Sequence, residues 1–205
     1  LSVFIGNFTL EAARSIVTTE DIDETAVVDV MTSLVTKSMV TVVSGTAPVR
    51  YRLLDATRAY TQEKSAASTG ADIVAQRHAL YFLELLERVD DGSSDALSAI
   101  SDQFANIRGA LAWCFSDNGD RVIGVALAAA SMPLLFHLSM LAECQLWAIR
   151  AIEAIDVTGA DPRHDLALHA ALGSARILAG QFEGMGVTYL NRALGLPDRL
   201  GDISS

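Results

Sequence analysis

The 205-residue sequence has few of the residues that mark fibrous, disulfide-rich or disordered chains, with 4 prolines, 2 cysteines and 6% aromatic residues. Hydrophobic residues make up 51% of the chain and charged residues 20%, which is enough apolar material for a packed core. Cys114 and Cys144 each lie within an apolar helical pattern. We therefore expect a compact cytoplasmic protein whose cysteines are reduced core thiols.

The sequence also lacks a cluster of Lys and Arg. It carries 15 basic and 25 acidic residues, for a formal net charge of −10, and residues 1–68 hold 6 basic against 8 acidic side chains. Nucleic-acid binding relies on cations that displace counterions from phosphates. The charge therefore predicts that the chain has no direct nucleic-acid partner and does not bind an anionic membrane surface.

One uncharged stretch, Val122 to Ala142, has about the length of a bilayer span. Pro133, His137 and the absence of a basic excess on either flank favour two buried helices that meet near residues 137–139. At the start of the chain, residues 1–4 lack an initiator Met and a basic region. They indicate an excised boundary rather than a signal peptide, so we expect no membrane segment.

Catalytic and metal-binding patterns are missing as well. No phosphate-binding Gly-x-x-x-x-Gly-Lys-Ser/Thr loop occurs, and Gly184-Met-Gly186 lacks the Lys that such a loop needs. Residues 161–169 contain two Asp and two His, but a metal site there would straddle a loop and a helix start, and Asp165 is more simply a helix cap. We predict no enzyme activity, no catalytic residue, no metal and no cofactor. None of the four histidines has an acid and a nucleophile nearby in a recognisable catalytic arrangement, so we expect structural roles for His78, His137, His164 and His169.

The first third of the chain has the order helix, helix, hairpin, helix. Thr9 can cap a helix over residues 10–17, and Asp23 or Glu24 opens a second helix with apolar residues every three or four positions. The β-branched run 39–43, a turn, and the alternating run 49–53 predict a β-hairpin. This order is typical of a winged helix.

The rest of the chain reads as helical. Residues 73–89 have a broad apolar face, and residues 97–114 form a long regular stripe in which Gly109 suggests close helix packing. Residues 147–152 resemble residues 189–194 in order and type. Leu172-Gly173, Tyr189 and Pro197 fall at places typical of a tetratricopeptide motif.

The predicted fold class is therefore mainly α: a winged helix with a small β-hairpin, followed by tetratricopeptide-like helical hairpins in an α-α superhelix. We predict three parts, a winged-helix-like domain at residues 1–68, a helical connector at 69–118 and tetratricopeptide-like repeats at 119–205.

Several segments together resemble one family. They resemble the part that follows the nucleotide-binding domain in bacterial STAND-type (NB-ARC-like) ATPases, including LuxR-type and winged-helix transcription regulators. The segments that carry the resemblance are 1–4 and 8–13, 34–40, 51–60, Arg77-His78, and Asn106-Ile-Arg-Gly-Ala-Leu-Ala-Trp113.

The resemblance implies a non-catalytic regulatory module for signal transduction, which packs on an upstream nucleotide-binding domain of the same chain. It places ATP and Mg²⁺ only in that missing domain, and it gives the repeats a protein or peptide effector. We expect partner contacts at Arg50 and Arg52 on the outward face of the hairpin. On the repeats, a small and apolar lining would consist of Ala170, Ser174, Ile177 and Leu178.

The alternative function is a winged-helix DNA-binding module of a transcription factor, with the segment Glu24 to Lys37 as recognition helix. This helix offers Glu24, Asp29 and a single Lys37, whereas major-groove readers commonly present Arg, Lys, Asn or Gln. The charge distribution therefore favours regulation by protein contact over DNA reading.

Overall fold

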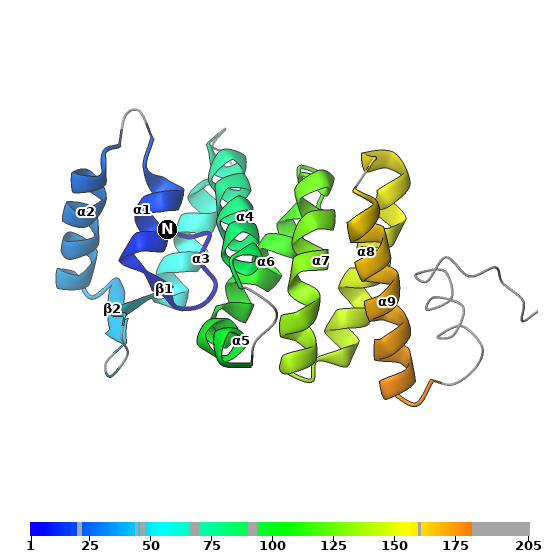
Figure 1. Cartoon of the computed structure of the whole chain (residues 1–205). Coiled ribbons are helices and arrows are strands. Elements are labelled where there is room, and N and C mark those ends of the chain that lie inside the picture. Colours follow the sequence, from blue (N-terminus) through cyan, green and yellow to red (C-terminus); the bar gives the residue numbers. More distant parts are fainter. Residues whose placement is uncertain are drawn as a thin grey trace, which may run out of the picture. The chain divides into compact units, whose positions relative to one another are not determined.

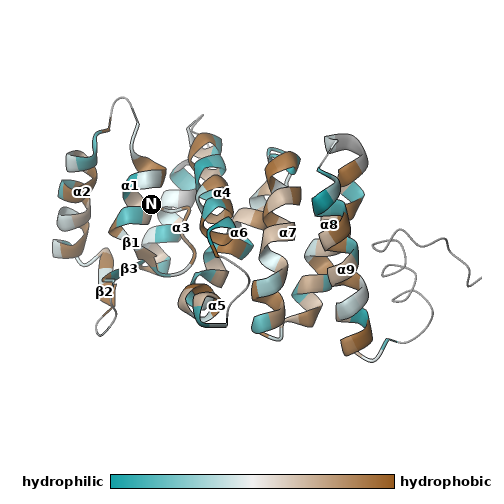
Figure 2. Ribbon diagram, viewed as in Figure 1, coloured by the Kyte–Doolittle hydropathy of each residue, from teal (hydrophilic) through white to brown (hydrophobic). Residues whose placement is uncertain are grey.

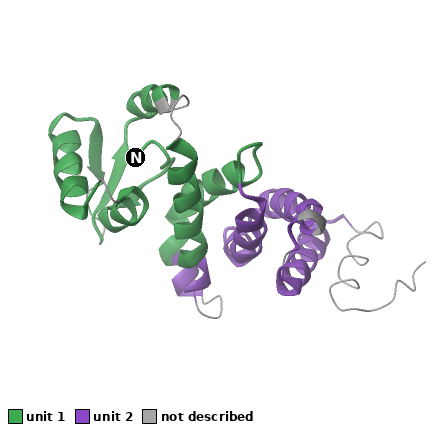
Figure 3. Ribbon diagram, turned by 90° about the horizontal axis from the view of Figure 1, so that it is seen from above, with its two compact units in different colours: residues 1–85, 99–119 green, residues 86–98, 120–205 purple. Residues whose placement is uncertain are grey.

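The computed structural model describes residues 1–19, 22–43, 45, 48–65, 70–89, 94–159 and 161–181. The fold is mainly helical with one small antiparallel sheet, as predicted (Figure 1). The chain divides into two compact units (Figure 3). Unit 1 consists of residues 1–85 and 99–119, and unit 2 consists of the described residues of 86–98 and 120–205.

Unit 1 begins with a short strand and two capped helices. Strand β1 (Phe8–Thr9) leads into helix α1 (Leu10–Val17), where the Thr9 side chain accepts a hydrogen bond from the Ala12 backbone N–H at 3.1 Å. Helix α2 (Glu24–Thr36) starts at Asp23, whose carboxylate accepts from the Ala26 N–H at 2.7 Å. Both predicted helix starts are confirmed, because each cap satisfies an N–H that the first turn leaves unpaired.

The hairpin forms as predicted and becomes part of a three-stranded sheet. Strands β2 (Val40–Val43) and β3 (Arg50–Leu53) pair antiparallel, and β1 adds to the other edge of β3. Side chains alternate between the two faces of a strand. One face therefore carries the buried pair Val40 and Leu53, and the other face carries Arg50 and Arg52.

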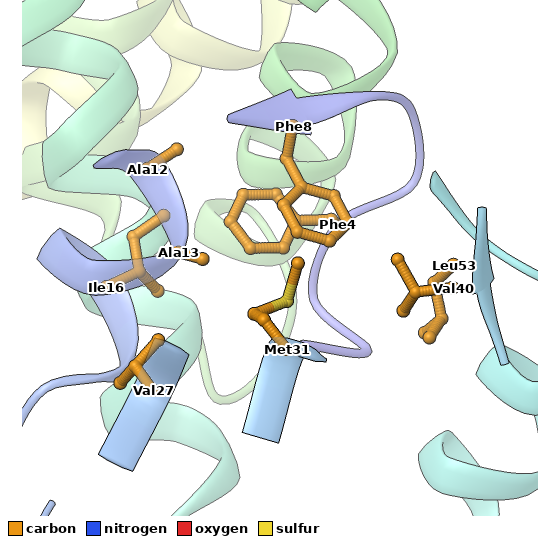
Figure 4. Close-up of a cluster of buried hydrophobic side chains, with 9 residues drawn as sticks. All are labelled: Phe4, Phe8, Ala12, Ala13, Ile16, Val27, Met31, Val40 and Leu53. Carbon is orange, nitrogen blue, oxygen red and sulfur yellow. The ribbon is translucent and has the colours of Figure 1, made fainter. Parts of the chain in front are cut away.

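The core of the winged helix lies between α1, α2 and the sheet (Figure 4). Phe4 and Phe8 stack with ring centroids 4.3 Å apart, and both side chains are fully buried. Burial of such aromatic rings contributes a large share of the apolar area that holds a small domain together. The remaining members of this cluster are Ala12, Ala13, Ile16, Val27, Met31, Val40 and Leu53.

The helices that follow differ from the predicted single stripe. Helix α3 (Asp55–Ser65) closes the winged helix, and helix α4 (Ala71–Glu87) follows. The stripe predicted over residues 97–114 is divided among α5 (Ser94–Ile100), a 3₁₀ turn η2 (Ser101–Gln103) and α6 (Phe104–Cys114). A 3₁₀ turn advances three residues per turn, so apolar spacings of three and four run through it without a visible break in the sequence.

Unit 2 contains three longer helices, α7 (Arg121–His137), α8 (Leu141–Thr158) and α9 (Pro162–Leu178). The uncharged stretch is split between α7 and α8, with Ser139 in the left-handed conformation (φ 56°) at the break, so the prediction of two helices is confirmed. Apolar residues extend along most of α7 (Figure 2), and many of them are buried. Both cysteines are free and buried, as predicted.

Two local predictions are wrong. The cap of α9 is Asp161, whose side chain accepts from the Arg163 N–H at 2.8 Å, whereas Asp165 lies in the first turn. Pro162 at the first helical position fixes this earlier start, because its φ angle already suits a helix. Gly109 packs against the Ile5 side chain of the N-terminal loop rather than against a helix, and a Cβ atom there would overlap Ile5.

Some predictions fall outside the described residues or stay predictions. Tyr189 and Pro197, and with them the second copy of the repeat, lie outside the described residues, as do residues 66–69 of the linker. The boundaries at residues 68 and 118 remain predictions.

Candidate nucleic-acid interface

The surface of α2 that faces away from the core is rich in hydroxyl groups. Val27 and Met31 point into the core, so the opposite side of the helix carries Thr25, Asp29, Thr32 and Thr36, all of them exposed. We call this set of four residues the α2 outer face. It presents three hydroxyls and one carboxylate at helical spacing, without a bulky or cationic side chain.

The hydroxyls of the α2 outer face are oriented by the helix itself. Thr32 Oγ1 donates to the Val28 carbonyl and Thr36 Oγ1 donates to the Thr32 carbonyl, both at 2.9 Å. The hydroxyl protons of Thr32 and Thr36 are therefore used within the helix, and the oxygen lone pairs and the methyl groups of these two residues are left to face outward. This side of the helix can accept hydrogen bonds and offer apolar contacts.

The outward face of the hairpin carries Arg50 and Arg52, and each faces a carboxylate. Arg50 forms an ion pair with Asp102 of η2, and its side chain is only 14% exposed. Arg52 is 55% exposed and lies 4.0 Å from Asp55. Both arginines lie on the face of β3 opposite the core, as expected from the alternation of the sequence, but the pairing with Asp102 could not be expected because about fifty positions separate it from Arg50.

Other cations of the winged helix are also paired. Arg58 donates to Asp55 at 2.5 Å and to the Ile5 carbonyl at 2.7 Å, and Arg14 lies 3.9 Å from Glu24. Lys37, at the C-terminal end of α2, is exposed. The local positive potential is therefore small and is concentrated at the end of α2 and at the hairpin.

A shallow pocket of about 220 Å³ separates α2 from the hairpin. Val28, Thr32, Val35 and Thr36 line one side, and Val42 and Tyr51 line the other, with Leu10 and Met31 also contributing. The α2 outer face therefore adjoins the side of the hairpin that carries Val42 and Tyr51, whereas Arg50 and Arg52 lie on the opposite side of the hairpin.

Helix α6 is attached to the N-terminal loop through one side chain. Asn106 is fully buried, and its Oδ1 accepts from the backbone N–H groups of Ile5 and Gly6, each at 2.9 Å. Its Nδ2 donates to the Asn7 carbonyl at 2.8 Å and to Gln103 at 3.1 Å. The amide is therefore fully used, and it fixes the loop that leads into β1.

His78 lies in the apolar interior of the same unit. Its ring makes edge contacts with Phe4 and Phe82, at centroid distances of 5.4 and 4.8 Å, and it is 1% exposed. Desolvation by burial lowers the pKa of His78 to about 3, so the imidazole is neutral near pH 7. The neighbouring residue Arg77, also on α4, donates a hydrogen bond to the Thr18 carbonyl at the end of α1.

The predicted contact residues of the repeats lie on α9. Ala170, Ser174 and Ile177 are partly buried, and Leu178 is 66% exposed. Nothing in the structure assigns a partner to them, and they stay predictions. In the same helix, His169 Nδ1 lies 2.8 Å from Asp165 Oδ1, one turn away.

Neither a metal centre nor a membrane span is found in the part of the chain that the structure describes. No group of three or more His, Cys, Asp or Glu side chains gathers there in a geometry that could hold a metal ion. None of the described helices combines the length with the apolar character that crossing a bilayer requires.

Comparison with known families defines the class of the first part of the chain. Residues 1–66 match the family described as the winged helix-turn-helix domain, and they contain α1, α2 and the hairpin in the order that this class requires. This part of the chain is similar to winged helix-turn-helix domains in both sequence and element order.

The chain is also homologous to longer proteins of mycobacteria. The proteins named as HTH-type transcriptional regulators Mb0914c of Mycobacterium bovis and Rv0890c of Mycobacterium tuberculosis are each 33% identical to it over 151 residues. The alignment covers 72% of this chain and 17% of each relative, so the chain spans less than a fifth of their length. No solved structure matches the chain.

These findings correct one prediction. The expectation that the chain has no direct nucleic-acid partner is wrong, because a winged helix-turn-helix match and relatives named as HTH-type regulators contradict it. The charge argument failed for two physical reasons. Net charge sums over the whole chain whereas phosphate contacts are local, and Ser, Thr and Asp side chains also contact bases.

Proposed function

We propose that this chain is a regulatory DNA-binding module in which α2 enters the major groove and the β2–β3 hairpin contacts the flanking backbone. The match of residues 1–66 to the winged helix-turn-helix domain carries the proposal. In helix-turn-helix proteins the second helix presents its side chains to base edges while neighbouring elements contact phosphates. Non-catalytic regulation of transcription stays the prediction for the longer protein.

The chemistry of the α2 outer face supports a particular mode of reading. Threonine methyl groups pack well against the thymine methyl group, and an Asp carboxylate accepts from the cytosine amino group. Thr32 and Thr36 expose methyl groups and acceptor oxygens, and Asp29 lies between them and Thr25 on the same face. We expect a preference for sites that contain both thymine and cytosine.

Affinity should be modest and only weakly affected by salt. The winged helix holds few cations, most of them paired, and non-specific binding is set by the number of phosphates that Lys and Arg neutralise. We expect Lys37 and the hairpin arginines to supply those contacts. A small number of contacts predicts a shallow slope of log affinity against log salt.

The test is selection of duplex DNA by the 205-residue chain, followed by titration of the enriched duplex by fluorescence anisotropy. The variant Thr36→Val removes a hydroxyl acceptor from the α2 outer face and should weaken binding of the enriched duplex about five- to tenfold. This is the lower end of the about 1–3 kcal/mol that a good bidentate base contact is worth, because a hydroxyl makes a single contact.

The matched control is Thr61→Val in α3. Thr61 Oγ1 donates to the Thr57 carbonyl at 2.9 Å, the same bond within a helix that Thr36 makes, but it lies outside the α2 outer face. It should leave DNA affinity unchanged. Failure to enrich any sequence, or equal losses in both variants, would contradict base reading by α2.

A second candidate function is control of an ATPase in a longer protein through packing of this module, with the helices of unit 2 as tetratricopeptide-like repeats that bind an effector. The exposure of Val30 on α2, at 53%, favours it, because an apolar side chain there suits a protein surface. Val30→Ser separates the two functions. It should weaken ATPase contact and leave DNA affinity within about twofold, since Val30 lies outside the α2 outer face.

A further inference from the structure

The outward face of the hairpin holds a cation in an unusual setting. Arg50 and Arg52 alternate on one strand and so point to the same side. Their chemistry is the same but their surroundings differ. Arg52 is 55% exposed, whereas Arg50 is 14% exposed and paired with Asp102, which lies on η2 just before α6.

Asp102 belongs to the helical segment that follows the winged helix-turn-helix domain. Residues 1–66 match that domain, and Asp102 lies 36 positions beyond its end. The carboxylate therefore comes from outside the domain and neutralises a cation of the hairpin, the element that we propose to contact the DNA backbone. An ion pair of this kind competes directly with a phosphate, because both are anions that a guanidinium can bind.

The pairing of Arg50 is incomplete. Its Nε and Nη1 are buried, and neither makes a hydrogen bond to the described residues, although Nη1 lies beside the Asp102 carboxylate. A buried donor without a partner carries a desolvation penalty, which a phosphate with several acceptor oxygens could relieve. The paired state is thus less stable than a full guanidinium-carboxylate network would be.

The attachment of α6 does not depend on this ion pair. Asn106 makes three hydrogen bonds to Ile5, Gly6 and Asn7 of the N-terminal loop, on residues distant in sequence from the hairpin. Arg77 adds a bond to the Thr18 carbonyl. Loss of the ion pair should therefore free Arg50 while the helical segment stays in place.

We infer that Arg50 can contact a phosphate of the DNA backbone, and that Asp102 masks Arg50 by occupying it in an intramolecular ion pair. This inference rests on the proposed function, because it assigns a role to the hairpin within DNA binding. The ligand is a backbone phosphate, so the contact adds affinity without sequence preference.

The test compares Asp102→Asn with the unaltered 205-residue chain, using a labelled duplex of random sequence titrated at several salt concentrations. The asparagine keeps an oxygen that can accept from Gln103, as Asp102 does at 3.3 Å, but it carries no charge. Release of one cation should steepen the salt slope by about 1 and raise affinity about eightfold at roughly 0.1 M salt, since each phosphate contact contributes about 0.9 to that slope.

Two further variants separate the mask from a general change of charge. Asp117→Asn removes one exposed negative charge from the same unit, at a position away from the hairpin, and should leave the slope unchanged. In the double variant Arg50→Gln with Asp102→Asn, the gain should vanish. Thermal melts by circular dichroism check that each variant is folded.

The outcomes distinguish this inference from the function on which it rests. If the unaltered chain binds DNA and Asp102→Asn has no effect, or no more than Asp117→Asn, the mask is wrong and the DNA-binding function stands. If Asp102→Asn gains affinity and the double variant keeps the gain, Arg50 is not the residue that is released. If neither the unaltered chain nor Asp102→Asn binds any duplex, both the mask and the proposed function fail.

Discussion

The two compact units bury polar side chains in different ways. In unit 1, Asn106 bonds to backbone groups of Ile5, Gly6 and Asn7, about a hundred positions away. In unit 2, Ser131 donates to the Leu127 carbonyl, four positions away in the same helix. Buried polar groups must find partners in either case.

This difference shows where long-range order comes from in each unit. Unit 1 depends on a few polar side chains that connect distant parts of the chain. The helices of unit 2 bury small apolar residues, so their packing depends on shape along many positions. The small buried residues of unit 2 include Ala128, Ala148, Ala151, Ala154, Ala171 and Ala175. Substitutions should therefore act over long distances in unit 1 and locally in unit 2.

The largest effect is expected for Asn106→Leu. It leaves two N–H groups and one carbonyl of the N-terminal loop, all in partly buried hydrogen bonds to Asn106, without these partners, and each such loss costs about 1–3 kcal/mol. We expect the free energy of unfolding to fall by about 4 kcal/mol in urea titrations, with fast hydrogen exchange at the Ile5 and Gly6 amides.

The control for that change is Asn118→Leu, at an exposed position in the turn after α6. It should alter stability by less than about 0.5 kcal/mol. Equal effects of the two substitutions would show that the loop attachment is not what stabilises unit 1.

A somewhat smaller and more local effect is expected for Leu127→Ala in α7. Leu127 is fully buried, and removal of such a side chain costs about 2–5 kcal/mol through lost apolar burial and a residual cavity. We expect a loss of about 3 kcal/mol, with hydrogen-exchange rates raised in α7 to α9. Raised exchange throughout α1 and α2 as well would contradict the division into two units.

The smallest of the three effects depends on pH. The pKa of His78 is lowered in the fold to about 3, below its ordinary value of 6.5, so the unfolded chain binds the proton more readily. The contribution of neutral, buried His78 to the free energy of unfolding is therefore complete above pH 6.5 and is lost as the pH falls toward 3. At pH 4.5 the loss should be about 2–3 kcal/mol.

The variant His78→Phe should remove this component of the acid sensitivity. A phenyl ring can take the place between Phe4 and Phe82 and does not titrate. Unfolding curves of both proteins between pH 7.5 and pH 4.5 measure the difference. Parallel loss of stability in the two proteins would mean that other groups cause the acid sensitivity.

Local features of the fold could be predicted from the sequence because they depend on neighbouring residues. Thr9 and Asp23 could be recognised as helix caps because the N–H groups that they bond lie only three positions further along the chain. The hairpin follows from β-branched and alternating residues around a turn. The break at Ser101–Gln103 could not be predicted, because its apolar spacing continues that of the adjoining helices.

The site was harder to predict than the fold. Asn106 lies in one of the segments that carry the family resemblance. Its hydrogen-bond partners lie about a hundred positions away, and no periodicity in the sequence indicates them. A partner contact at Arg50 on the outward face of the hairpin stays a prediction, whereas the pairing of Arg50 with Asp102 needs the tertiary structure. The net charge gave the wrong expectation for nucleic acid, because it says nothing of which side chains line the α2 outer face.

The most direct test of the central claim, that α2 of a winged helix-turn-helix domain reads DNA, is a titration of the ¹⁵N-labelled chain with its enriched duplex, followed by NMR. The account predicts that amide signals of α2, especially those of Thr25, Asp29, Thr32 and Thr36, shift together with those of the β2–β3 hairpin, while α9 is unaffected. Shifts confined to α7 to α9, or no shifts at any DNA concentration, would contradict it.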